Sequence, residues 1–263
     1  NGNAPPVYQN PEDFFEKTHV TQVLEDLVQT VIENVGGKPS GNRIQRLQTG
    51  FGGGKTHLLL AIYHLLNSPD EVEGIDKISS VIEESAVDSI PSAETAVIVG
   101  TDLDISGGRS VDDINIRTPW GELAYQLGGK DAYEIIEDSD QDRIAPGKDK
   151  IVRVFDEVGP SVILVDELLQ YALKAKAVEI GESTLAEQTV SFIDELAKAV
   201  GTVENVFTIL SLQASERYEM FGDPEAAEQM LNQIESKIER VDTVTRPIQN
   251  SRIKPLNQGI GTD

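Results

Sequence analysis

The sequence predicts an α/β protein, a three-layer sandwich built on a mostly parallel five-stranded sheet. Three observations lead to this prediction. Short apolar runs alternate with helical segments, a glycine-rich loop joins one of these runs to an apolar helix, and an acidic pair follows another run. Strands that are separated by helices pair in parallel and carry helices on both faces of their sheet.

The predicted strands are short runs of apolar residues. The clearest is SVILV at 161–165, whose continuous apolar character is typical of a central parallel strand that is buried on both faces. Similar runs lie at 96–100 (AVIVG) and 206–210 (VFTIL), and a shorter one at 43–47 leads into the glycine-rich loop. A fifth strand is expected at 242–245 (DTVT).

The predicted helices show apolar residues at helical spacing. The segment 56–66 (THLLLAIYHLL) is apolar nearly all round, so we expect a buried helix that begins at the loop. A helix that begins near Pro119 is expected to stop at the glycine pair 128–129. The remaining helices are expected at 18–34, 70–85, 185–200 and 224–240, with an extended arm at 5–15 and a charged surface excursion at 138–150.

The chain of 263 residues is long enough for one large α/β domain with an accessory piece. We divide it into an N-terminal arm and helix at 1–41 and a core domain at 42–250. The remainder, 251–263, shows no periodicity and is interpreted as a C-terminal linker or a truncated boundary.

The composition is strongly acidic. The chain has 45 Asp and Glu against 22 Lys and Arg, a formal net charge of −23. The acids are spread along the chain, which fits either adaptation to high salt or a basic partner, and we favour the first interpretation. Because Lys and Arg are not clustered, direct contact of this segment with nucleic acid is not expected.

Other features of the composition point to the cytoplasm. The chain has no cysteine, so it forms no disulfides or thiolate metal sites. Its mean hydropathy is −0.25, and it contains no apolar run near the roughly 20 residues that a membrane span needs. The first residues show no basic stretch followed by an apolar core. We therefore expect a cytoplasmic protein without membrane contact.

The string GFGGGKT at 50–56 predicts a loop that cradles the phosphates of ATP bound with Mg²⁺. Its glycines leave backbone N–H groups free to approach the β- and γ-phosphates, and Lys55 adds a positive charge. Thr56 offers a hydroxyl to Mg²⁺, and the following helix directs its positive end at the anion. The usual motif has glycine where Thr49 stands, so the turn into the loop is expected to differ slightly. The expected nucleotide contacts are Gly50, Phe51, Gly52, Gly53, Gly54, Lys55, Thr56 and His57.

The pair Asp166–Glu167 directly follows the apolar run at 161–165. This is the strand end at which ligands bind in open α/β sheets. Asp166 is expected to hold Mg²⁺ with Thr56, and Glu167 is expected to polarise the attacking water as a general base. Four apolar residues followed by Asp-Glu could also be a strand that ends at a helix cap, but the upstream glycine-rich loop favours the catalytic interpretation.

The order of the predicted strands indicates a further catalytic candidate. It is typical of the P-loop enzymes that place an extra strand between the Lys-loop strand and the Asp-Glu strand. In that branch the inserted strand, here 206–210, carries a polar residue that faces the γ-phosphate. Ser211 and Gln213 are the candidates, and we prefer Gln213.

Several residues are weaker candidates. An arginine finger toward a neighbouring subunit of a homo-oligomer could come from Arg217, Arg240 or Arg246, although a solvated surface position is commoner. Asp102 and Asp104 are expected to cap a loop rather than to bind a metal.

Histidines and aromatic residues are assigned mainly to packing. His19 (on the helix expected at 18–34), His57 and His64 lack a metal-ligand pattern, so we expect packed or hydrogen-bonded side chains. Trp120 is expected to anchor the core. The remaining aromatic candidates, which could pack near the nucleotide base, are Tyr8, Phe14 and Phe15.

Three strings together resemble a known family: LQTGFGGGKTHLLLAIYHL, TPWGELAYQLGG and VILVDELLQY. They are similar to a prokaryotic ATP-binding family, domain of unknown function 499, whose members resemble AAA+ P-loop ATPases. Members occur, often as much longer chains, in gene clusters linked to phage defence. The resemblance runs from about residue 8 to 246, and it implies nucleotide contacts at Lys55 and Thr56 and metal and water roles at Asp166 and Glu167. The acidity suits a haloarchaeal source.

Two functions remain open from the sequence. The first is an AAA+-like ATPase module of a larger protein, which hydrolyses ATP to drive an attached effector or other defence-system proteins. The second is a nucleotide-gated switch that binds ATP without appreciable hydrolysis. Glu167 favours the first.

Overall fold

The computed structural model describes residues 5–39, 41–49, 54–213 and 223–242. None of the helices in these ranges is long and apolar enough to cross a membrane. In chain order the elements are η1 (Pro6–Tyr8), α1 (Pro11–Lys17), α2 (Gln22–Val35), β1 (Ile44–Thr49), α3 (Lys55–Asn67), α4 (Pro69–Val72), α5 (Asp76–Glu84), β2 (Glu94–Val99), β3 (Arg109–Val111), β4 (Ile114–Ile116), α6 (Pro119–Glu134), α7 (Glu137–Gln141), α8 (Lys148–Val158), β5 (Ser161–Asp166), α9 (Leu168–Ala175), β6 (Glu179–Ile180), β7 (Ser183–Thr184), α10 (Leu185–Thr202), β8 (Val206–Gln213) and α11 (Pro224–Asp242).

The described part of the chain is built on a parallel sheet of four strands in the order β1-β8-β5-β2. Strand β5 is buried at every position, as its continuous apolar run predicts. Thr208 of β8 pairs with Ile44 of β1 on one side and with Ile163 of β5 on the other. The fifth strand was expected at 242–245, but Asp242 is the last residue of α11, and 243–245 lie outside the described residues.

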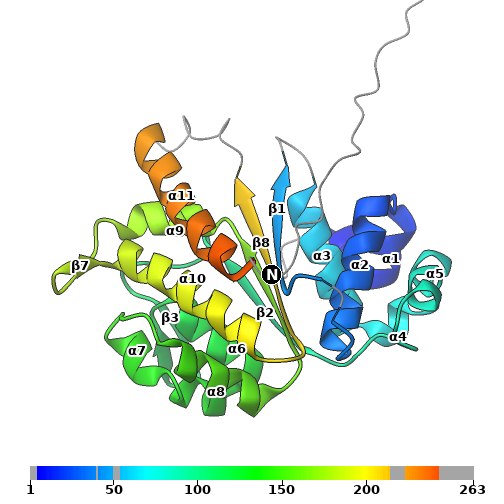
Figure 1. The fold of residues 1–263 in the computed structure, drawn as a ribbon, viewed down its shortest axis with the longest axis horizontal. Helices are drawn as coiled ribbons and strands as arrows, with labels where there is room; N and C mark the ends of the chain where they lie inside the picture. The colour runs from blue at the N-terminus through cyan, green and yellow to red at the C-terminus, as the bar shows by residue number, and fades with distance from the viewer. Residues whose placement is uncertain (1–4, 40, 50–53, 214–222, 243–263) are drawn as a thin grey trace, which may run out of the picture.

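Helices cover both faces of the sheet, so the fold has three layers (Figure 1). Helices α1–α5 lie on one face, where their apolar residues share a core with Phe207 and Ile209 of β8. Helices α6 and α8–α11 lie on the other face and share a second core with Leu210 and Leu212. Alternate residues of a strand point to opposite faces, which is how one apolar strand serves both cores.

Residues 6–8 and 11–17 are helical, which corrects the expectation of an extended arm at 5–15. Asn10 caps α1, because its side chain accepts a hydrogen bond from the backbone N–H of Asp13 at 2.8 Å. Phe14 and Phe15 are each 1% exposed and belong to the core beside α3. Burial of these two rings holds the short helix against the domain. His19, expected on the next helix, lies in the link before it.

Helix α6 continues past the glycine pair at which we expected it to stop. Gly128 and Gly129 leave the helical conformation, with φ of −140° and 61°, but the helix resumes after this kink. Trp120, in its first turn, is 1% exposed and packs against Phe192 with ring centroids 5.6 Å apart. The expectation that Trp120 anchors the core is therefore confirmed.

Helix α6 also covers the outer edge of the sheet. The amide of Gln126 accepts from the backbone N–H of Val97 at 2.7 Å and donates to its carbonyl at 3.0 Å. Because Val97 lies in the edge strand β2, this contact satisfies backbone groups that would otherwise be open to strand pairing.

The charged stretch at 138–150 is not a simple surface excursion. It contains most of α7 and the start of α8, and Asp140 within it is fully buried. The Asp140 carboxylate accepts from the hydroxyls of Thr118 at 2.5 Å and Tyr133 at 2.8 Å. Burial raises the pKa of Asp140, and the hydrogen bonds partly oppose that rise.

The segment predicted as one helix at 70–85 divides into α4 and α5.

Candidate functional site

The end of the glycine-rich loop and the acidic strand end meet in space. Thr56, the second residue of α3, donates its hydroxyl to Oδ2 of Asp166 at 3.0 Å. Asp166 is the last residue of β5 and only 8% exposed. The two residues are 110 positions apart in the chain. The structure therefore brings together the two strings that the sequence assigned to one site.

Gly54 and Lys55 form the beginning of α3. Gly54 occupies the N-cap position with φ of 73°, a left-handed conformation that favours glycine. Glycine has no side chain, so the N-cap residue does not cap the backbone amides in the first turn of the helix. Lys55 follows as the first helical residue and is half-buried. The other expected loop contacts, Gly50, Phe51, Gly52 and Gly53, lie outside the described residues.

Strand β8 lies between the loop strand β1 and the acidic strand β5, as the sequence predicted for the strand at 206–210. Ser211 of this strand pairs with Leu47 of β1 and follows Leu210, which pairs with Val165. Period two places Ser211 on the same face as Phe207 and Ile209, the face that α3 covers. Asp166 shares this face with Val162 and Leu164. Ser211 and Asp166 are thus neighbours across the sheet, below the start of α3.

The side chain of Ser211 is buried, and its hydroxyl has no hydrogen-bond partner among the described residues. The residue is 3% exposed, and its Oγ forms no hydrogen bond within the part of the chain that the structure describes. A buried polar atom without a partner is costly, and such atoms mark sites that complete their hydrogen bonding with a ligand or water. Gln213, the candidate that the sequence analysis favours, ends β8, and its side chain lies outside the described part of the molecule.

Glu167 directly follows β5 and precedes α9. Its backbone is left-handed, with φ of 54° and ψ of 24°, an uncommon conformation for a residue other than glycine. Its carboxylate accepts a hydrogen bond from the hydroxyl of Thr101 at 3.0 Å. Thr101 comes two residues after β2, the strand that pairs with β5. The structure therefore holds Glu167 at both its backbone and its side chain.

The residue before Thr101 makes this arrangement sterically possible. The backbone N–H of Gly100 donates to the carbonyl of Asp166 at 2.8 Å. A Cβ at position 100 would overlap the carbonyl oxygen of Glu167. Only glycine fits so close an approach of two backbones. The sequence analysis did not single out Gly100 or Thr101. The available signal was a small residue and a hydroxyl-bearing residue directly after a strand, at the end of the sheet where the other site residues were expected.

The remaining predicted residues separate into structural ones and ones outside the described part. Asp104 caps its own loop, as expected, because it accepts from the backbone N–H and the hydroxyl of Ser106 at 2.8 and 2.7 Å. These hydrogen bonds lower the pKa of Asp104. Of the arginine-finger candidates, Arg217 and Arg246 lie outside the described residues, as does the side chain of Arg240 in α11.

His57 and His64 are packed and hydrogen-bonded, as predicted. Nε2 of His57 lies 2.9 Å from Oγ1 of Thr18, and Nε2 of His64 lies 3.0 Å from the carbonyl of Tyr8. Burial lowers the pKa of both histidines. The ring of His57 is thus engaged with the N-terminal helices. Among the described residues, no group of three or more His, Asp or Glu is placed to hold a metal ion.

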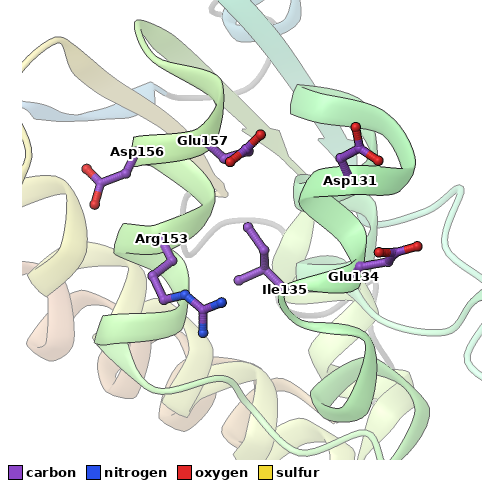
Figure 2. A pocket seen from close by; sticks show the side chains of 6 residues that line it. All are labelled: Asp131, Glu134, Ile135, Arg153, Asp156 and Glu157. Carbon is purple, nitrogen blue, oxygen red and sulfur yellow. The ribbon is translucent and has the colours of Figure 1, made fainter.

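A groove lies away from the Thr56–Asp166 contact. It is a groove of about 490 Å³ between α6 and α8, with four carboxylates, one arginine and Ile135 around it (Figure 2). Helix α8 leads into the beginning of β5, whereas Asp166 ends that strand. The groove therefore lies near the beginning of β5, whereas the Thr56–Asp166 contact lies at the end of that strand. Its lining residues are Asp131, Glu134, Ile135, Arg153, Asp156 and Glu157.

These observations define a three-layer α/β protein with a parallel sheet, and with hydroxyl and carboxylate groups gathered where its central strands end. The family model of the DUF499 N-terminal domain matches residues 1–246, and the chain belongs to that family. No curated protein and no solved structure matches the chain.

Proposed function

We propose that this protein binds ATP with Mg²⁺ between the start of α3 and the end of β5, and that it hydrolyses the nucleotide. The observation that carries the proposal is the 3.0 Å hydrogen bond from Thr56, in the string GGGKT, to Asp166. Phosphate-binding loops of this type use the hydroxyl after the lysine, together with an acid at the end of a neighbouring strand, for the same Mg²⁺.

The phosphates would be held by the chain's own positive groups. The glycines of the loop permit close approach of backbone N–H groups, and Lys55 supplies a full charge at the first turn of α3. The positive end of the helix dipole adds to this attraction. These groups matter more in this chain than in most, because a net charge of −23 otherwise repels an anionic ligand.

The residues gathered at this site fit Mg²⁺. This ion prefers oxygen ligands and is usually bound through one or two protein groups, with the rest supplied by phosphates and water. Thr56 and Asp166 supply a hydroxyl and a carboxylate. The hydroxyl of Ser211, which has no hydrogen-bond partner among the described residues, lies on the same face. When bound, Mg²⁺ neutralises charge that develops on the transferred phosphoryl group.

Glu167 is the proposed general base. A carboxylate in this position orients and polarises the water that attacks the γ-phosphate. Thr101 acts as a positioning residue, because its hydroxyl fixes the direction of the Glu167 carboxylate. Ser211, rather than Gln213 alone, is a candidate to contact the γ-phosphate, because its hydroxyl is buried and has no partner in the described part of the chain.

A second candidate function is a nucleotide-gated switch without appreciable hydrolysis. The hydrogen bond from Thr101 favours it in one respect, since it occupies Oε2 of the carboxylate that would otherwise be free to orient the attacking water. In both functions, the family resemblance supports coupling to an effector. That effector could be the rest of a longer chain, a homo-oligomeric neighbour or phage-defence proteins. The acidic composition supports a cytoplasm of high salt.

Binding of ATP is tested by titrating wild type and Lys55→Ala with Mg-ATP in molar KCl by calorimetry. We expect Lys55→Ala to raise Kd at least about 10-fold, since it removes a charge-assisted contact worth ~1.5–3 kcal/mol. Lys176→Ala, which removes an exposed lysine after α9, is the matched control and should bind like wild type. Equal affinity of wild type and Lys55→Ala would refute the proposed site.

A further inference from the structure

An aromatic cluster lies beside the first turn of α3. The ring of His57 lies 4.5 Å from that of Phe14 and 6.5 Å from that of Tyr8, measured between centroids. Tyr8 and Phe14 are themselves 6.3 Å apart. His57 directly follows Thr56, so the cluster begins one residue from a hydroxyl of the proposed phosphate site.

Only one of the three aromatic candidates near the N-terminus is open to a ligand. Phe14 and Phe15 are each 1% exposed, so their faces are fully used in the core. Tyr8 is 42% exposed, although Phe14 packs against it. An aromatic residue that packs against the core and stays partly exposed offers a surface on which a planar ring can stack.

Tyr8 is also held in place by its backbone. Its carbonyl accepts a hydrogen bond from Nε2 of His64 at 3.0 Å, which fixes the tautomer of that histidine. Its backbone N–H donates to the carbonyl of Pro5 at 2.9 Å. Because α3 carries His64, the position of Tyr8 is set by the same helix whose first turn holds Lys55 and Thr56. A rigid platform loses little entropy when it binds a ligand.

The neighbouring histidine is fixed as well. The hydroxyl of Thr18 donates its single hydrogen to the carbonyl of Phe14 at 2.6 Å. The ring of His57 must therefore donate from Nε2 to Thr18 at 2.9 Å, which leaves Nδ1 as the acceptor. The cluster thus presents an open phenol ring beside an imidazole of defined orientation.

From this arrangement we propose that Tyr8 is the stacking platform for the aromatic base of the bound nucleotide. The inference rests on the proposed function, because it assigns the base end of the same ligand. The phosphates lie at the beginning of α3, and the base lies over the exposed face of Tyr8. Stacking tolerates different bases, so Tyr8 supplies affinity rather than discrimination among them.

The test compares a ligand that has a base with one that lacks it. Binding of Mg-ATP and of Mg-tripolyphosphate is measured by calorimetry for wild type, Tyr8→Ala, Tyr8→Phe and Tyr63→Ala. Removal of a stacking ring should raise the Kd of ATP ~5- to 100-fold in Tyr8→Ala and leave the Kd of tripolyphosphate unchanged. Tyr8→Phe keeps the ring and should bind ATP like wild type.

Tyr63 is the matched control. It is a tyrosine on the same helix as His57 and is 38% exposed, but its ring neighbour is His64 rather than His57. Tyr63→Ala should bind both ligands like wild type. An unchanged Kd for ATP in Tyr8→Ala, with ATP still bound by wild type, would overturn the platform alone. A parallel loss of both ligands in Tyr8→Ala would show a structural role instead, and failure of wild type to bind either ligand would overturn the proposed function and the platform together.

Discussion

Thr101 donates its hydroxyl to Oε2 of Glu167 at 3.0 Å, across the ends of the paired strands β2 and β5. This contact decides how the candidate base is presented. Glu167 has a left-handed backbone, and Gly100 leaves just enough room for its carbonyl. The hydrogen bond from Thr101, the close approach of Gly100 and the left-handed backbone therefore all restrain one residue, Glu167. Such a combination of local strain and restraint is common at functional sites.

We predict that Thr101→Val lowers kcat for ATP hydrolysis about 10-fold and leaves KM nearly unchanged, because a misdirected general base forfeits part of its ~100-fold or larger contribution. Thr101→Ser, which keeps the hydroxyl, should restore kcat. A raised KM with unchanged kcat would assign Thr101 to binding instead.

We predict that Gly100→Ala destabilises the fold by roughly 2 kcal/mol or more, because its Cβ overlaps the carbonyl oxygen of Glu167 and backbone has to move. Urea denaturation measures the loss. Gly74→Ala is the control, because a Cβ there meets nothing within 4 Å, and it should change stability little. Equal stability of the two variants would show that β2 and β5 can separate at low cost.

We predict that stability falls as pH drops below about 6.5. Burial lowers the folded-state pKa of His57 and His64 below the ordinary histidine value of 6.5, so the unfolded chain takes up protons first. Their contribution is complete above pH 6.5 and is lost as pH falls through the lowered folded values. Urea midpoints between pH 7.5 and 5.5 should fall less in the His57→Gln, His64→Gln double variant. An identical slope in both proteins would contradict this origin.

We predict that the melting temperature rises with KCl concentration. The Debye length shrinks from about 30 Å at 0.01 M salt to about 3 Å at 1 M, so salt screens the mutual repulsion of a chain with net charge −23. Calorimetric scans in KCl and in an uncharged osmolyte such as sucrose separate screening from general exclusion. A melting temperature that is independent of KCl would contradict the salt-adapted interpretation and favour a basic partner.

Parts of the fold with a single dominant signal could be predicted from the sequence. The run at 161–165 is apolar at every position, and β5 is buried at every position. Strand β8 took its place between β1 and β5, as the order of the runs indicated. The proximity of Thr56 and Asp166 could be predicted because both residues were assigned to the same end of a parallel sheet.

What sequence reasoning missed depends on long-range packing. The charged residues at 138–150 predicted a surface segment, but Asp140 is buried. Its carboxylate accepts hydrogen bonds from the hydroxyls of Thr118 and Tyr133, which no local sequence pattern reveals. The helix at Phe14 and Phe15 is held by its contact with the core beside α3. The role of Thr101 depends on a strand pairing that brings it to Glu167, 66 positions away.

The most direct test of the proposed function is steady-state ATP hydrolysis by wild type, Lys55→Ala and Glu167→Gln in molar KCl with Mg²⁺, with ATP binding measured on the same samples. We predict turnover by wild type, weakened binding by Lys55→Ala, and retained binding with turnover reduced by a factor on the order of 100 or more for Glu167→Gln. Equal and negligible turnover in wild type and Glu167→Gln, with ATP bound by both, would contradict the ATPase function and leave the nucleotide-gated switch.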